Sequence, residues 1–150
     1  MLHHRIDVDA THEFVSMQER IEAAGRIPMD AMKTVLVVDD DPSITEFLEM
    51  ALEDAGYQVL AAVGGAALQV AHDRHPDVIL LDIMMPEMDG VEVSQHLHTD
   101  PVTADIPIIA MSAHERLRNL AGRMSAEDEL PKPFHCQDLY ATVARWMPSA

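Results

Sequence analysis

Five short apolar runs that alternate with amphipathic stretches are the feature that most restricts the fold of this chain. The runs predict strands at Thr34–Val38, Gln58–Ala62, Val78–Leu81, Ile108–Met111 and Asp128–Leu130. The stretches between and after them predict helices at Ser43–Ala55, Ala66–Arg74, Val91–His98, Glu115–Met124 and His135–Trp146. Strands that are apolar on both faces need helices on both sides, and repeated strand–helix–strand units give parallel strands. The pattern therefore predicts an α/β fold with a doubly wound, five-stranded parallel sheet.

The first 32 residues differ from the rest, because they contain no strand-like run. Apolar residues recur at three- and four-residue steps from Phe14 to Ala24, which predicts one amphipathic helix. We therefore divide the chain into an N-terminal helical extension, residues 1–32, and an α/β domain, residues 33–150. The sequence leaves three interpretations of the helix open: a surface for homodimerisation or a partner, an arm on its own domain, or sequence upstream of a natural start at Met29 or Met32.

Charge and cysteine content exclude several classes of function. The chain has 26 acidic and 10 basic residues, a formal net charge of -16, so it lacks the positive surface that binds nucleic acid through phosphates. Cys136 is the single cysteine, which rules out an internal disulfide, and the N-terminus lacks the apolar core of a signal peptide. The apolar runs are far shorter than the roughly 20 residues that cross a bilayer. We expect a cytoplasmic protein with no membrane span and no direct nucleic-acid binding.

Polar residues follow the predicted strands at the ends where a parallel sheet places its functional crevice. Asp39–Asp41 follow the first strand, Asp82 follows the third, Ser112 follows the fourth, and Lys132 comes shortly after the fifth. Carboxylates held close together repel one another and favour a compensating cation. Oxygen ligands without His or Cys favour Mg²⁺, with Mn²⁺ as the alternative.

Such a site has the parts for phosphoryl transfer to a carboxylate. Asp82 is the best candidate for the nucleophile, because it ends the most apolar strand and should lie at the centre of the crevice. A metal ion would neutralise the incoming phosphoryl oxygens, Lys132 would supply a positive charge, and Ser112 would donate from its hydroxyl.

Four ordered motifs resemble the receiver domain of two-component response regulators, over Lys33 to about Met147. They are Val35–Pro42 (VLVVDDDP), Asp77–Gly90 (DVILLDIMMPEMDG), Pro107–Ala113 (PIIAMSA) and Leu130–Phe134 (LPKPF). The resemblance implies a flavodoxin-like strand order 2-1-3-4-5. It also implies a phosphoprotein that acts as a switch in signal transduction and carries an aspartyl phosphate. Such a protein would catalyse only its own phosphotransfer and dephosphorylation and would not be an enzyme for a separate substrate.

The resemblance also implies roles for single residues. Asp82 would be the phosphoacceptor. Asp40 would bind Mg²⁺ directly, Asp39 would act mainly through a metal-bound water, and the backbone carbonyl of Met84 would complete the protein ligands. Lys132 would pair with Asp82 or its phosphoryl group, Ser112 would move to hydrogen-bond a phosphoryl oxygen, and Lys132-Pro133 resembles the family's cis peptide.

Three further residues near the site need separate comment. Asp41 is expected outside the metal shell, as the cap of the helix that begins near Ser43. Met84 stands where the family tunes its own dephosphorylation, and we expect its apolar side chain to slow hydrolysis. Glu129 replaces the aromatic residue usually found three positions before the lysine, which puts coupling through an aromatic rotamer in doubt.

The function implied by the resemblance is that of a single-domain response regulator. It would accept a phosphoryl group on Asp82 from a sensor histidine kinase or a histidine phosphotransfer protein, as a chemotaxis-type regulator or a phosphorelay intermediate. Because the chain stops at Ala150, we expect its output to act on another protein, whose identity the sequence does not give. An alternative is a phosphorylation-independent interaction module that docks through Glu129 and the N-terminal helix. A dehalogenase-type phosphatase is disfavoured, because Met84 stands where that family has a second Asp.

Overall fold

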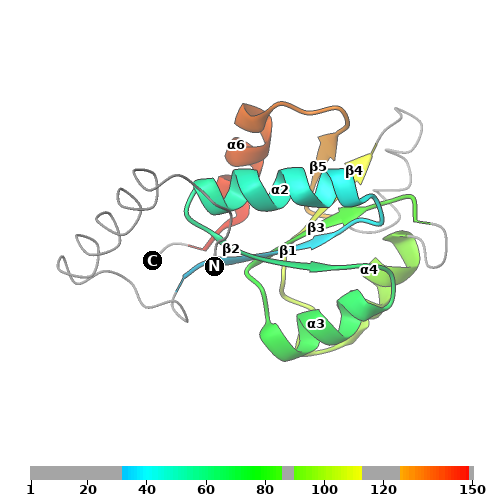
Figure 1. Ribbon diagram of the computed structural model, residues 1–150. Coiled ribbons are helices and arrows are strands. Elements are labelled where there is room, and N and C mark those ends of the chain that lie inside the picture. The colour runs from blue at the N-terminus through cyan, green and yellow to red at the C-terminus, as the bar shows by residue number, and fades with distance from the viewer. Residues whose placement is uncertain (1–31, 86–89, 113–125, 149–150) are drawn as a thin grey trace, which may run out of the picture. The chain divides into compact units, whose positions relative to one another are not determined.

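The sheet has the strand order that the sequence predicts. The protein, a computed structural model, is described for residues 32–85, 90–112 and 126–148. Its strands lie in the order β2-β1-β3-β4-β5, and all neighbouring pairs are parallel (Figure 1). They are β1 (Thr34–Val38), β2 (Gln58–Ala62), β3 (Val78–Asp82), β4 (Ile108–Ser112) and β5 (Asp128–Pro131). The predicted flavodoxin-like fold is therefore confirmed.

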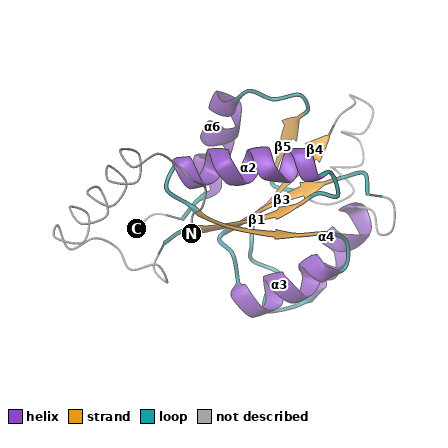
Figure 2. Cartoon of the chain, in the orientation of Figure 1, coloured by secondary structure: helices purple, strands orange, loops and turns teal. Residues whose placement is uncertain are grey.

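Helices cover both faces of this sheet (Figure 2). On one face lie α2 (Pro42–Asp54) and α6 (Cys136–Trp146), and on the other lie α3 (Ala66–Arg74) and α4 (Gly90–Thr99). Every residue of β3, the central strand, is buried. The apolar runs in the sequence follow from this arrangement, because a strand covered on both faces has no solvent-facing side.

Two apolar clusters, one on each face of the sheet, form the core. Successive residues of a strand point to opposite faces, so β1 places Val35 and Val37 in one cluster and Leu36 and Val38 in the other. The cluster beneath α2 and α6 also contains Leu48, Leu52, Leu80, Ile109, Leu139 and Val143. The cluster beneath α3 and α4 also contains Ala67, Ala71, Ile79, Leu81, Val93 and Leu97.

The described elements begin or end within a residue of the predicted bounds, and the differences have local causes. The helix α2 begins at Pro42 rather than Ser43, because proline suits the first helical position after a capping residue. Asp41 is that cap, since its carboxylate accepts a hydrogen bond from the Ser43 N–H at 2.9 Å. The expected role of Asp41 is thus confirmed. The strand β3 extends to Asp82, which is still paired with Met111 of β4.

Two predicted helices fall outside the described residues, namely the N-terminal helix and the helix at Glu115–Met124. By its contacts the chain divides into two compact units, Met1–Met32 and Lys33–Ala150. Within the described ranges, no helix has both the length and the apolar character that a membrane span needs.

The end of α6 is tied to the outer strand β5 by polar contacts to one carboxylate. Trp146 Nε1 donates a hydrogen bond to Asp128 at 2.9 Å, and Arg145 forms an ion pair with the same group. Asp128 also accepts a hydrogen bond from the Glu129 N–H at 2.8 Å. These contacts fix the start of β5 against the last turn of the last helix.

Gly90, the first residue of α4, lies against the end of β3. Its N–H donates to the Ile83 carbonyl at 2.9 Å. A Cβ atom at this position would lie 2.5 Å from the carbonyl oxygen of Asp82 and 2.8 Å from the Cα of Ile83. Both neighbours are backbone atoms, so the close approach of α4 to β3 requires glycine here.

We predict that Gly90→Ala lowers the free energy of unfolding by roughly 1–3 kcal/mol, because the backbone of α4 or β3 must move to accept the methyl group. Urea unfolding measures the effect. Gly65→Ala is the matched control, since Gly65 is exposed and its φ of -64° suits alanine. Equal stability of the two variants would show that the contact at Gly90 is not restrictive.

Candidate functional site

Three aspartates meet at the carboxyl edge of the sheet. Asp39 and Asp40 follow β1, and Asp82 ends β3, the hydrogen-bonded neighbour of β1. Each of the three offers a carboxylate oxygen, and these oxygens lie within 4.8 Å of one another. Parallel neighbours end at the same edge, which is why residues far apart in the sequence come together here.

Asp39 and Asp82 are held in place by burial and by hydrogen bonds from nearby backbone. Their side chains are 1% and 9% exposed. Asp39 Oδ1 accepts a hydrogen bond from the Asp41 N–H at 2.9 Å, and Asp82 Oδ1 accepts one from the Met84 N–H at 3.3 Å. The turns after β1 and β3 therefore orient both carboxylates toward the same point.

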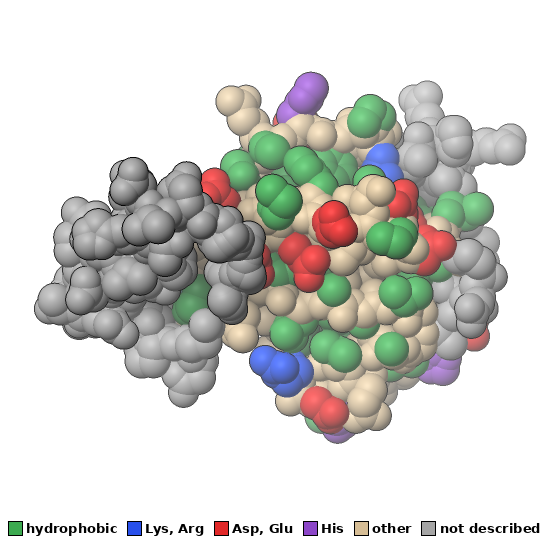
Figure 3. All heavy atoms as spheres, viewed as in Figure 1, with side chains coloured by type: hydrophobic (Ala, Val, Ile, Leu, Met, Phe, Trp, Pro, Cys, Tyr) green, Lys and Arg blue, Asp and Glu red, His purple; other side chains and the backbone are tan. Residues whose placement is uncertain are grey.

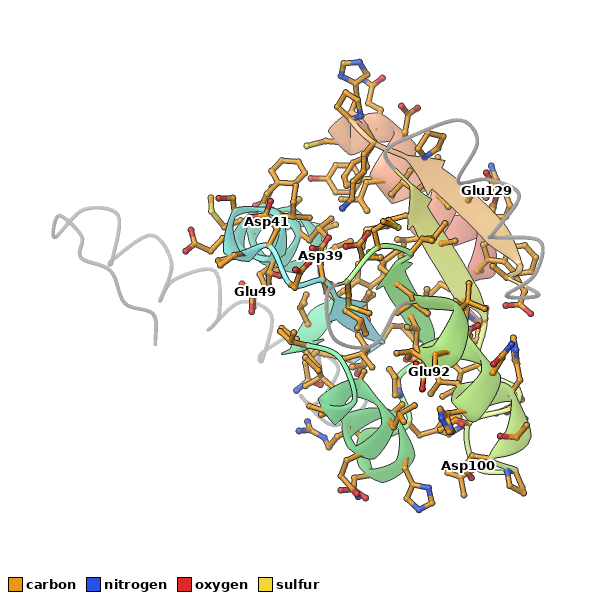
Figure 4. All side chains as sticks on the ribbon, turned by 90° about the vertical axis from the view of Figure 1, so that its right-hand side faces the viewer. Asp39, Asp41, Glu49, Glu92, Asp100 and Glu129 are labelled. Atoms are coloured by element: carbon orange, nitrogen blue, oxygen red, sulfur yellow. The ribbon has the colours of Figure 1, made fainter. Side chains whose placement is uncertain are left out.

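Lys132 brings a positive charge to these two aspartates. It comes directly after β5, and the Lys132-Pro133 peptide is cis, as the family resemblance implied. Its Nζ lies 3.0 Å from Asp39 Oδ2 and 3.5 Å from Asp82 Oδ1. The sequence analysis paired Lys132 with Asp82 alone, whereas the structure places it between Asp82 and Asp39, closer to Asp39. Figure 4 looks onto this end of the sheet and labels Asp39.

The electrostatics of the cluster disfavour a full set of ionised carboxylates. Burial, followed by the charge of Asp39, raises the pKa of Asp82 to about 6, although Lys132 opposes the shift. Burial alone would lower the pKa of Lys132, but its hydrogen bond to Asp39 and the charge of Asp82 outweigh this and raise it. Lys132 is therefore a permanent cation that compensates only part of the negative charge.

The donor set fits a hard divalent cation. Carboxylate oxygens are the ligands that Mg²⁺ prefers, and no His or Cys belongs to the cluster. Two carboxylate charges within 4.8 Å of each other repel by at least about 3.5 kcal/mol at an effective dielectric constant near 20. The single ammonium group of Lys132 cannot neutralise three carboxylates. A divalent cation would supply the missing positive charge and relieve the repulsion.

Two other residues named by the sequence analysis lie at the same edge. Ser112 ends β4 and is paired with Pro131 of β5, but its side chain lies outside the described part of the structure. Met84 lies two residues after Asp82, and this residue is 58% exposed. Asp41, which caps α2, does not belong to the acidic cluster.

The structure also shows contacts that sequence reasoning missed. Thr45 Oγ1 donates to the Asp39 carbonyl at 3.4 Å, which links the first turn of α2 to the loop that carries the aspartates. Gly90 closes the space behind Asp82, as described above. The motif Asp89-Gly90 was the only sequence signal for the second contact, and nothing in the sequence indicates the first.

The family model for the response regulator receiver domain matches residues 35–144. This chain belongs to the response regulator receiver domain family. A curated relative from Synechocystis is named DNA-binding dual master transcriptional regulator RpaA. It is 41% identical over 115 residues, which are 75% of this chain and 48% of the relative. The chain thus spans about half the length of the curated relatives that it matches.

Solved receiver structures have the same fold. Chemotaxis protein CheY4 of Vibrio cholerae superposes with a TM-score of 0.73 at 32% identity, covering 78% of this chain and 100% of that chain. The receiver domain of sensor histidine kinase PA1611 from Pseudomonas aeruginosa superposes with a TM-score of 0.74 at 29% identity, covering 79% of this chain and 100% of that chain. That structure has a magnesium ion coordinated in its active-site cleft.

The raised pKa of Asp82 gives the stability of this receiver domain a specific pH dependence. Between the ordinary carboxyl pKa near 4 and the folded-state value of about 6, the folded protein holds a proton that the unfolded chain has lost. The stability contributed at this position therefore falls as the pH rises through this window.

We predict that Asp82→Asn, measured in a chelator, is more stable than the wild type by about 1–3 kcal/mol at pH 7, and that the difference shrinks toward pH 4. Thermal unfolding of both proteins across this range measures it. Asp41→Asn is the control, since it changes a neighbouring acid outside the cluster. If the difference in stability between the two proteins did not change with pH, ionisation of Asp82 would not destabilise the folded protein.

Proposed function

We propose that this receiver domain is a phosphorylation switch in which Asp82 accepts the phosphoryl group. The observation that carries the proposal is the convergence of Asp82, Asp39, Asp40 and Lys132 at one edge of the sheet. Asp82 is the nucleophile because it ends the central strand, is held by the Met84 N–H, and contacts the lysine.

The donor in this proposal is a phosphohistidine of a sensor histidine kinase or a histidine phosphotransfer protein. A carboxylate oxygen of Asp82 forms the new bond to phosphorus, the phosphorus–nitrogen bond breaks, and the imidazole keeps the electron pair and takes up a proton. The Lys132 ammonium already pairs with the Asp82 carboxylate. After transfer it pairs with the phosphoryl oxygens instead. Ser112 is the hydroxyl donor to a phosphoryl oxygen.

Asp39, Asp40 and Asp82, with the backbone carbonyl of Met84, are the residues that would hold Mg²⁺, or Mn²⁺ in its place. When bound, the ion supplies positive charge against the phosphoryl oxygens and offsets the repulsion among the carboxylates. The protein's own contribution is to fix the carboxylates of Asp39 and Asp82, through the hydrogen bonds from the backbone of Asp41 and Met84.

The output of this switch, in our proposal, is a changed affinity for a partner protein. Adding a phosphoryl group changes the charge beside Lys132 and Ser112, at the ends of β5 and β4. The net charge of -16 supports a protein partner over direct binding to nucleic acid. We propose no enzymatic action on a separate substrate.

Intact-protein mass spectrometry after incubation with Mg²⁺ and acetyl phosphate tests this function. We predict one phosphoryl adduct on the wild type, none on Asp82→Asn, and none with a chelator. Asp40→Asn should need more Mg²⁺ for the same yield, whereas Asp41→Asn should match the wild type, because asparagine also caps a helix.

The outcomes separate the proposed switch from its alternative. An adduct that persists in Asp82→Asn would mean that another residue is the acceptor. No adduct from acetyl phosphate or from a phosphorylated histidine phosphotransfer protein would favour a phosphorylation-independent interaction module. The half-buried Glu129 in β5 would then be the first residue to change in binding assays.

The exposed side chain of Met84 leads to a prediction about the lifetime of the phosphoryl group. An apolar side chain next to the acceptor gives an attacking water no hydrogen bond, whereas an amide would orient one. We predict that Met84→Asn loses its phosphoryl group severalfold faster than the wild type, followed by the decay of the adduct in the mass spectrum. Met84→Leu, which stays apolar, should decay at the wild-type rate, and equal rates for all three proteins would contradict the prediction.

A further inference from the structure

The two outer strands of the sheet differ in what they present to another strand. Within four residues β5 carries Asp128 and Glu129 and ends in Pro131, and charge and proline are common means of preventing edge pairing. The other outer strand, β2, has the sequence QVLAA, with neither charge nor proline. It lies within residues 56–71, which contain no Asp, Glu, Lys, Arg or His, although 24% of the chain is charged.

Among the described residues, none pairs with the outward backbone groups of β2, so an added strand could bind there. In a parallel ladder, alternate residues direct both their N–H and C=O to the same neighbour. The Gln58 N–H donates to the Lys33 carbonyl at 2.9 Å, so the groups of Gln58, Leu60 and Ala62 face β1. The groups of Val59 and Ala61 therefore face away from the sheet, and Ala61 is exposed.

The helix α2 carries a row of acidic side chains, and Glu49 of this row lies on the side of the open edge. Glu46, Glu49 and Glu53 recur at steps of three and four along α2, so they form one row, and α2 contains no basic residue. Among the described residues, none of the three takes part in an ion pair with a lysine or arginine. Figure 3 looks onto the β2 edge and shows acidic side chains above a band of apolar side chains, backbone and uncharged polar side chains. Figure 4 shows Glu49 leaving α2 on that side.

We propose that the edge of β2 is a docking site for an extended, basic segment of a partner protein, which adds to the sheet beside β2. The backbone groups of Val59 and Ala61 would pair with the segment, as in other cases of strand addition. Because side chains alternate along a strand, every second side chain of the segment would face α2, where lysine or arginine meets the row of glutamates. The remaining side chains would lie on the side of Leu60 and Ala62.

Charge argues for a basic partner over the two other candidate occupants. A second copy of the chain would bring an identical row of glutamates and has the same net charge of -16. Residues 1–31 also hold more acidic than basic side chains. Neither compensates the glutamates of α2, whereas a basic segment does.

Fluorescence anisotropy with the full chain and a labelled, capped peptide of alternating lysine and valine tests the proposal. Ala61→Pro removes an N–H that faces away from the sheet, a position where an outer strand tolerates proline. We expect this variant to bind the peptide about tenfold more weakly or worse, since it loses a pairing donor and its ring obstructs the added strand. Circular dichroism confirms that the variant is folded.

A second pair of measurements does not depend on a proline. The same peptide with N-methylated alternate amides keeps its charge but cannot pair along one edge, so we expect it to lose most of its affinity. Glu49→Gln should weaken binding of the unmodified peptide, whereas Asp54→Asn should not. Asp54 is the matched control because it lies on the other flank of α2. It is seven residues, two helical turns, after Phe47, whose ring packs against Phe134 just before α6.

Three results would overturn the proposal. The first is no binding of the peptide, and the second is equal binding of the N-methylated peptide, which would leave only general attraction to an acidic surface. The third is evidence that a second copy of the chain, or residues 1–31, binds the β2 edge instead. A second copy would be indicated by a wild-type dimer that dissociates in Ala61→Pro, as measured by sedimentation. Residues 1–31 would be indicated by peptide binding that appears only after they are removed. None of these measurements involves phosphorylation, so the proposal stands or fails independently of the switch.

Discussion

Asp39 and Asp82 are held together in a nearly solvent-free place, and their mutual repulsion is the constraint on which the rest of the site depends. Their oxygens lie within 4.8 Å of each other, where two unit charges repel by at least about 3.5 kcal/mol at an effective dielectric constant near 20. The fold sustains it because β1 and β3 are rigid central strands that cannot separate without breaking the core. A cation bound between these carboxylates would relieve the repulsion.

The topology and the composition of the site could be read from the sequence for the same physical reason. Continuous apolar strands demand cover on both faces, and parallel strands bring their carboxyl ends to one edge. Asp39, Asp82 and Lys132 were therefore expected to meet before any distance was known. The short run Asp128–Leu130 also predicts β5, although it is the weakest of the five strand patterns.

The contacts inside the site could not be read in this way. Lys132 Nζ lies 3.0 Å from Asp39 and 3.5 Å from Asp82, and no pattern of residue types encodes so small a difference. The closeness of Gly90 to Asp82 depends likewise on the angle at which α4 leaves the sheet. Sequence patterns specify which residues share an edge, and packing decides which atoms touch.

The helix α2 connects the two surfaces for which we propose functions. Its cap, Asp41, donates its backbone N–H to Asp39, and its acidic row lies beside the edge of β2. The two surfaces are nevertheless distinct, since one is the carboxyl edge of the sheet and the other is the side of an outer strand. A partner on β2 would leave Asp82 accessible to a phosphodonor, so a scaffold and a kinase could engage this domain together.

The hydrogen bond between Trp146 and Asp128 gives this protein an optical reporter of its own. Trp146 is the only tryptophan in the chain, and its indole N–H is bonded to the first residue of the strand that leads into Lys132. A shift that moves β5 relative to the last turn of α6 would stretch or break that bond and change the surroundings of the indole. The emission of a single indole therefore follows the strand that carries the lysine, without a label and in the unmodified chain.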